Sequence, residues 1–164
     1  MRHIISILMQ NEAGALTRVT SMFSSRGYNI ESLSVAPTEN PQVSRLTMVT
    51  AGSDEVIDQI NKQLFKLVDV VQITDMTMNE HIERELLLMK VNLHDNANVA
   101  DIVSAAGASV LDSSPETYTV QLTGTGVQID DFMKTLGSRS EVLAVVRSGS
   151  MAIGRGAKVM SAEL

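Results

Sequence analysis

The sequence has no cysteine among its 164 residues. Disulfides, cysteine-based metal sites and thiol catalysis are therefore excluded. Aromatic residues make up only 3% of the chain and tryptophan is absent, which argues against surfaces that stack nucleic-acid bases. No apolar run approaches ~20 residues, so the sequence predicts no transmembrane helix.

The chain also lacks a basic excess, because its formal net charge is −6. This acidic balance argues against nucleic-acid binding, which usually needs a basic face. The length of 164 residues is enough for one domain or two small ones, and the hydrophobic fraction of 44% is ample for a packed core. The first residues show no signal-peptide pattern, and we expect a cytoplasmic protein with no membrane partner.

Apolar spacing in the first half indicates alternating strands and helices. Leu16, Val19, Met22 and Phe23 recur at the helical spacing, and Gly27 is a stop signal. The expected elements are strands over 3–9, 28–36, 44–50 and 68–75, a helix over 15–26 and a second helix from 53–55. The order β-α-β-β-α-β is the ferredoxin-like split motif.

A weaker copy of the same order follows a joint near residues 79–83. Strands are expected over 85–93, 109–112, 117–123 and 142–146, with helical stripes over 99–106 and 129–136. The sequence therefore predicts an α+β protein with two tandem ferredoxin-like βαββαβ domains, residues 1–78 and 79–164. The small, polar residues from Ser148 onward predict a loose tail on the second domain.

A four-stranded sheet covered by two helices leaves one face and two edges without a partner. Ser32, Ser34 and Thr47 fit a partly covered face. Edge-to-edge pairing of sheets would satisfy the exposed backbone groups. We therefore expect a homodimer formed through the N-terminal domain.

The most informative segment runs from Asn11 to Leu16, between the first strand and the first helix. A glycine turn into a helix presents backbone N–H groups that bind anions. The N–H groups of Gly14, Ala15 and Leu16 suit the carboxylate of an amino acid, and the helix dipole adds roughly 0.3–1 kcal/mol. An ordinary strand-to-helix turn is the alternative interpretation.

A second strand begins near Asn29 and Ile30. The ammonium of an amino acid needs oxygen atoms, which the side chains of Asn11 or Asn29 or backbone carbonyls supply. An aliphatic ligand side chain suits an apolar rim made by Leu16 or Ile30. Together the two segments favour a small-molecule sensor over a catalyst, although Asn29 also fits a simple strand entry.

Other candidate chemistry is weaker. His3, His81 and His94 are widely separated and match no familiar metal spacing, so surface or structural roles are expected. Gly124 and Gly126 lie between a strand and a helix, as in a phosphate-binding loop, but the third glycine of that motif is missing.

Several segments resemble the family of acetolactate synthase (acetohydroxyacid synthase) small regulatory subunits. The most specific are 11–19 (NEAGALTRV), 23–38 (FSSRGYNIESLSVAPT), 66–70 (KLVDV) and 83–86 (EREL). The resemblance covers nearly the whole chain. The first half looks like an ACT domain, a module that often binds amino acids, and the second like the family's ACT-like domain.

The resemblance implies a subunit with no catalysis and no cofactor of its own. Its partner would be the large catalytic subunit, which would hold thiamine diphosphate, magnesium and FAD. The chain would stimulate that subunit and confer feedback inhibition by valine in branched-chain amino-acid biosynthesis. Valine would bind between two N-terminal ACT domains. The matching effector residues are Asn11, Gly14, Ala15, Leu16, Asn29 and Ile30.

Other functional classes remain open at this point. A free-standing amino-acid sensor could act on a different enzyme. An RNA-binding ferredoxin-like module is disfavoured by the acidic charge and the scarcity of aromatic residues. A small enzyme of this fold lacks a candidate nucleophile or base, and the fold alone decides nothing.

Overall fold

The computed structural model describes residues 1–93 and 98–164, so His94 lies outside the described residues. The chain forms two compact units, one made of residues 1–82 and 150–164 and the other of residues 83–149. In the described residues, no helix is both long enough and apolar enough to cross a membrane.

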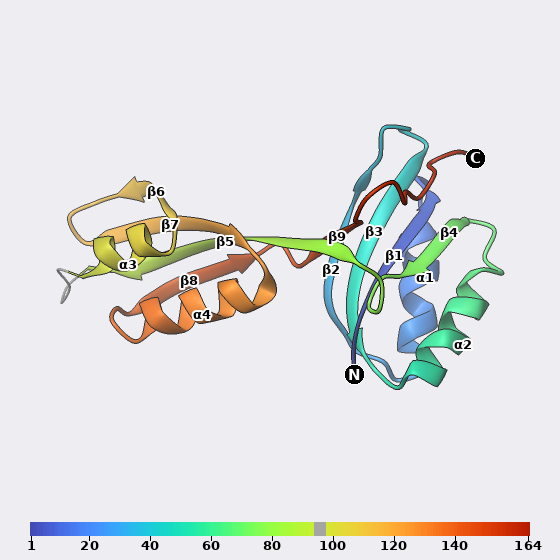
Figure 1. The fold of residues 1–164 in the computed structure, drawn as a ribbon, viewed down its shortest axis with the longest axis horizontal. Coiled ribbons are helices and arrows are strands. Elements are labelled where there is room, and N and C mark those ends of the chain that lie inside the picture. The colour runs from blue at the N-terminus through green and yellow to red at the C-terminus, as the bar shows by residue number, and fades with distance from the viewer. Residues whose placement is uncertain (94–97) are drawn as a thin grey trace. The chain divides into compact units, whose positions relative to one another are not determined.

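The first unit has the α+β order expected from the sequence (Figure 1). Its sheet has the strand order β2-β3-β1-β4, with α1 and α2 on one face. The elements are β1 (Arg2–Gln10), α1 (Ala15–Ser24), β2 (Ile30–Pro37), β3 (Val43–Ala51), α2 (Asp54–Leu64) and β4 (Val70–Asp75).

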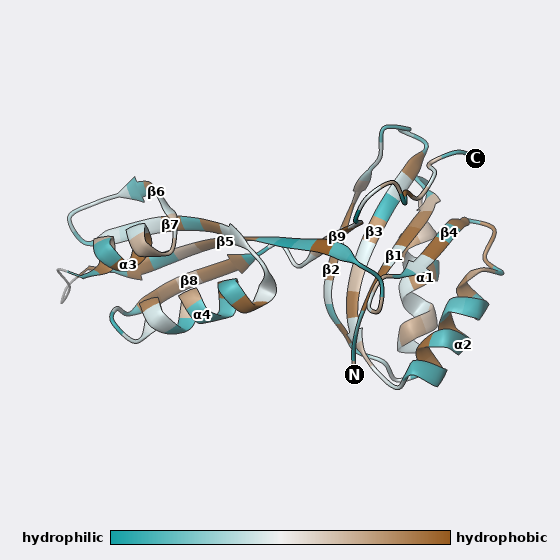
Figure 2. Ribbon diagram, viewed as in Figure 1, coloured by the Kyte–Doolittle hydropathy of each residue, from teal (hydrophilic) through white to brown (hydrophobic). Residues whose placement is uncertain are grey.

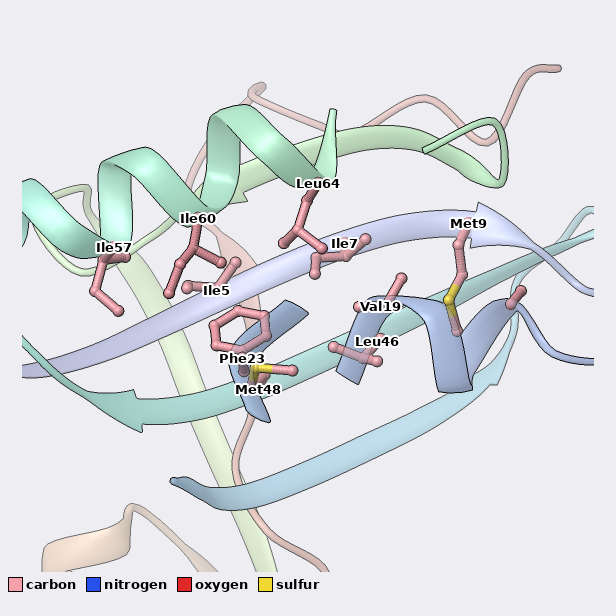
Figure 3. Close-up of a cluster of buried hydrophobic side chains, with 11 residues drawn as sticks. Ile5, Ile7, Met9, Val19, Phe23, Leu46, Met48, Ile57, Ile60 and Leu64 are labelled. Carbon is pink, nitrogen blue, oxygen red and sulfur yellow. The ribbon is translucent and has the colours of Figure 1, made fainter. Parts of the chain in front are cut away.

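Both helices bury an apolar stripe against this sheet. Figure 3 shows Ile60 and Leu64 of α2 above Ile5 and Ile7 of β1, while Phe23 of α1 lies among the same core residues. All five side chains are fully buried. The outer side of α2 is hydrophilic (Figure 2), so its apolar spacing explains which face it buries.

The register fixes which ends of the strands meet. In the β2–β3 pair, Ile30 lies opposite Thr50, and in the β1–β3 pair Thr50 lies opposite His3. At the other end of the sheet, Pro37 lies opposite Ser44, and Ser44 opposite Met9. The start of β2 therefore lies at the same end of the sheet as the start of β1, with β3 between them, and β2 is an edge strand.

The second face of this sheet is covered by the C-terminal segment, residues 150–164. Ala152 of β9 (Met151–Gly154) packs with Ile4 and Val49, and Ala162 packs with Leu8 and Val43. This differs from the loose tail of a second domain expected from the sequence. The sheet already presents apolar side chains, and small alanine side chains fit closely against them. The segment can therefore pack on the sheet without a helical or strand-like apolar pattern in its own sequence.

Polar contacts hold the same segment. Arg45 Nη2 donates a hydrogen bond to the backbone oxygen of Ala152 (3.1 Å), and Asn40 Nδ2 donates to that of Ala162 (3.0 Å). The Arg45 guanidinium is partly desolvated in this position, and burial lowers its pKa.

The second unit repeats the architecture, which confirms the prediction of two ferredoxin-like domains. Its strand order is β6-β7-β5-β8, and Leu87, Met89, Phe132 and Leu136 are central residues of its own apolar core. The elements are β5 (His81–Asn92), α3 (Val99–Ala105), β6 (Ser109–Ser113), β7 (Thr117–Gly124), α4 (Gly126–Gly137) and β8 (Val142–Arg147).

Candidate effector site

The turn after β1 is fixed by backbone and side-chain hydrogen bonds. The Asn11 N–H donates to the Gln42 oxygen (2.8 Å), and Asn11 Nδ2 donates to the Pro41 oxygen (3.0 Å). Asn11 itself is exposed. Its amide nitrogen is therefore engaged, and its Oδ1 is the atom that could accept from a ligand ammonium.

Gly14 is the N-cap of α1 and has the left-handed backbone angles φ 85° and ψ −14°. Residues other than glycine rarely adopt this backbone conformation. A β-carbon added at Gly14 would lie 2.7 Å from Nη1 of Arg18, one helical turn later. The backbone angle thus favours glycine at this position, and any side chain there would also displace the guanidinium.

Arg18 is held by a carboxylate from the loop between α2 and β4. Its Nε donates to Asp69 Oδ2 (2.5 Å) and its Nη2 to Asp69 Oδ1 (3.0 Å). The Asp69 side chain is only 4% exposed, whereas that of Arg18 is 48% exposed. Hydrogen bonding to Arg18 lowers the pKa of Asp69, and the same contact raises the pKa of Arg18.

The first turn of α1 keeps free donors. Ala15 N–H donates to the Glu12 oxygen (3.2 Å) and Arg18 N–H to the Gly14 oxygen (3.0 Å). Within the described part of the chain, the N–H groups of Gly14, Leu16 and Thr17 have no acceptor. Two of the three predicted donors, those of Gly14 and Leu16, are therefore available to a carboxylate, whereas the Ala15 N–H is already in use.

The three apolar candidates, Ala15 and Leu16 in the turn and Ile30 at the start of β2, differ in how much surface they expose. Ala15 is buried in the core of the first unit, with 1% exposure. Leu16 and Ile30 are half-buried and pack against the edge of that core. Only these last two leave apolar surface for a ligand side chain.

The sequence-predicted residues form two separate groups. Asn11, Gly14, Ala15 and Leu16 lie at the end of β1, and Asn29 and Ile30 lie at the start of β2. The register places the start of β2 level with His3, across β3, at the opposite end of the sheet from the turn. At about 3.3 Å per residue, the eight residues of β2 separate the two groups by roughly 23 Å within one chain.

Sequence reasoning missed Arg18 and Asp69 as functional candidates. Two signals were present: Arg18 lies four residues after Gly14 on a helix, and Asp69 lies in the KLVDV segment at 66–70. Their pairing could not be predicted from local sequence patterns, because the two residues are 51 positions apart in the chain.

The histidines have structural environments where the structure describes them. His3 is buried between two carboxylates, with Nδ1 2.9 Å from Asp75 Oδ2 and Nε2 3.1 Å from Asp54 Oδ1. It joins the start of β1 to α2 and β4. Over residues 1–93 and 98–164, no three histidine, aspartate or glutamate side chains are grouped so that they could hold a metal ion.

The glycine turn before α4 is a helix cap. The Thr125 hydroxyl accepts from the Gln128 N–H, and the Gln128 side chain accepts from the Thr125 N–H, which forms a capping box. A β-carbon at Gly124 would lie 2.7 Å from Gln128 Oε1. The cap explains this glycine without a bound phosphate.

Comparison with known proteins gives matches along nearly the whole chain. Residues 5–72 match the model of the small subunit-like ACT domain of acetohydroxyacid synthase, and residues 84–156 match the model of the small subunit of acetolactate synthase. The isozyme 3 small subunits of acetolactate synthase from Salmonella typhimurium and Escherichia coli are each 43% identical over 162 residues, covering 98% of this chain and 99% of theirs.

A solved structure agrees with these sequence matches. The small subunit of acetolactate synthase from Thermotoga maritima superposes with a TM-score of 0.86 at 32% identity. The match covers 95% of this chain and 98% of that one. Sequence and fold therefore point to the same group of proteins.

Proposed function

Because the chain belongs to the family of acetolactate synthase small subunits, we propose that it stimulates a large catalytic subunit and makes that subunit sensitive to valine. In this proposal the large subunit carries the chemistry and its thiamine diphosphate, magnesium and FAD. The small subunit has no catalysis of its own and works in the cytoplasm. Its N-terminal unit is the effector-binding module.

The observation that carries the effector proposal is the separation of the two groups of candidate residues. A single chain holds the carboxylate-binding turn and the Asn29–Ile30 segment at opposite ends of β2. Antiparallel pairing of two β2 edges about a two-fold axis would exchange those ends. The turn of one copy would then face Asn29 and Ile30 of the other.

This arrangement supports a homodimer in which each effector site contains residues from both copies. β2 is an edge strand, so its outer backbone groups are available for pairing. The exposed Val35, near the middle of β2, would lie close to the dimer axis. Two such sites per dimer follow from the symmetry.

Valine meets each group of the proposed site with suitable chemistry. Its carboxylate would accept from the N–H groups of Leu16 and Thr17, and its ammonium would donate to Asn11 Oδ1 or the Asn29 side chain of the second copy. Its isopropyl group would contact Leu16 and Ile30. These contacts require ordering of both copies, which couples binding to the dimer interface.

Reconstitution with an acetolactate synthase large subunit tests this function. Adding the chain should raise the rate of acetolactate formation from pyruvate, and valine should reverse that increase. The isolated chain with thiamine diphosphate, magnesium and FAD should form no acetolactate. A chain that neither stimulates the large subunit nor responds to valine would refute the proposal.

A further inference from the structure

The Arg18 guanidinium has one end fixed and one end free. Asp69 accepts from Nε and Nη2, and within residues 1–93 and 98–164 no group accepts from Nη1. The buried carboxylate thus fixes the plane of the guanidinium, while 48% of the arginine side chain stays open to solvent. A guanidinium that is fixed in this way loses little further freedom when it binds an anion.

The free end lies over the effector turn. Nη1 is 2.7 Å from the position that a β-carbon of Gly14 would take. Among the described residues, the N–H groups of Gly14, Leu16 and Thr17 have no acceptor. One charged donor and three backbone donors therefore belong to the same turn.

We propose that Arg18, positioned by Asp69, contacts the carboxylate of the bound amino acid through Nη1. This inference rests on the proposed effector function and adds two residues to it. Arg18 is the cationic contact, and Asp69 acts through Arg18 as a positioning residue. The loop between α2 and β4, which carries Asp69, thereby becomes part of the effector response.

A purely structural ion pair is the competing explanation. Such a pair would tie α1 to the α2–β4 loop and would affect folding without affecting ligand choice. The burial of Asp69 fits both explanations, but the position of Nη1 over the Gly14 turn and its lack of an acceptor among the described residues fit the ligand contact better. The two explanations differ in whether loss of Arg18 weakens binding only of ligands that carry a carboxylate.

The test measures binding of L-valine and of L-valinamide, which lacks the carboxylate, to the full-length chain by isothermal titration calorimetry. Arg18→Gln should weaken valine binding by about tenfold to a hundredfold, the range for a lost hydrogen bond to a charged group. It should leave valinamide binding unchanged. Asp69→Asn should reduce the preference for valine in the same direction.

Lys62→Gln is the matched control. Lys62 is an exposed cation of the same unit, and it pairs with Asp58 at 2.7 Å. Its removal changes the net charge equally and should change neither affinity. Melting curves of every variant establish that each is folded at the temperature at which the affinities are measured.

The outcomes separate this inference from the function on which it rests. Equal weakening of valine and valinamide by Arg18→Gln, or no weakening of either, would overturn the role of Arg18 while leaving the effector function intact. Failure of the unaltered chain to bind valine would overturn both. Because Arg18 is half-exposed, its variant tests the inference even where Asp69→Asn fails to fold.

Discussion

Replacing Gly14 by aspartate should abolish the valine response for two reasons. The new side chain strains the backbone and displaces Arg18, and its carboxylate repels the carboxylate of valine. The left-handed backbone at φ 85° costs a side chain about 1–2 kcal/mol. The new β-carbon also lies 2.7 Å from Arg18 Nη1, so the guanidinium must move although Asp69 holds it. The added carboxylate then attracts Nη1 and repels the carboxylate of valine.

Gly107→Asp provides the matched comparison. Gly107 has a similar backbone angle, φ 71°, but a β-carbon there meets nothing within 4 Å. Both variants should therefore lose about 1–2 kcal/mol of stability, which lowers the melting temperature by several degrees in a domain of this size. Only the Gly14 variant should also lose the ligand contacts.

The assay is a valine titration of the reconstituted holoenzyme with each variant in saturating amount. Allosteric coupling is typically about 1–3 kcal/mol, so losing the dominant contacts should raise the half-inhibitory valine concentration by about tenfold or more. Coincident curves for Gly14→Asp and the unaltered chain would show that the turn is merely structural. If Gly107→Asp raised the half-inhibitory valine concentration equally, the loss of inhibition in Gly14→Asp would be explained by backbone strain and not by lost ligand contacts.

Three further predictions concern the proposed interface and the ion pairs. Asn29→Ala should weaken inhibition by valine but change stability by less than about 0.5 kcal/mol, since Asn29 is exposed; an unchanged titration curve argues against its role. Val35→Lys should reduce self-association in sedimentation, because symmetry brings two like charges together at the paired β2 edges, and a persistent dimer would exclude that interface. Asp75→Asn should remove stability that depends on pH. The pKa of Asp75 lies below its ordinary value: burial, the largest influence, opposes this lowering, and hydrogen bonds from Thr77 and His3 outweigh it. The advantage of the unaltered chain over Asp75→Asn in urea melts should therefore be full above pH 4 and fall as the pH drops below that value.

The fold could be predicted from the sequence because its signals are local. Helical spacing in 15–26 and alternation in 117–123 depend on neighbours a few residues away, and the structure has α1 and β7 there. The helical stripe predicted over 129–136 likewise lies within α4 (Gly126–Gly137). The doubled β-α-β-β-α-β order is enough to identify the ferredoxin-like class.

The candidate site could be predicted only in part. The glycine turn is visible in the sequence, but the distance between Leu16 and Asn29 depends on strand register, which joins residues far apart in the chain. The pairing of Arg18 with Asp69 has the same origin. The packing of Ala152 and Ala162 was missed because small residues without periodicity also occur in loose segments.

The return of residues 150–164 to the N-terminal unit has a consequence for biosynthesis. A ribosome releases the N-terminal strands and helices first, and domains generally begin to fold as they emerge. The sheet face formed by Ile4, Leu8, Val43 and Val49 then stays uncovered until residues 150–164 have emerged as well. Until then the nascent chain carries an exposed apolar surface, so the N-terminal unit is complete only after residues 83–149 have been synthesised.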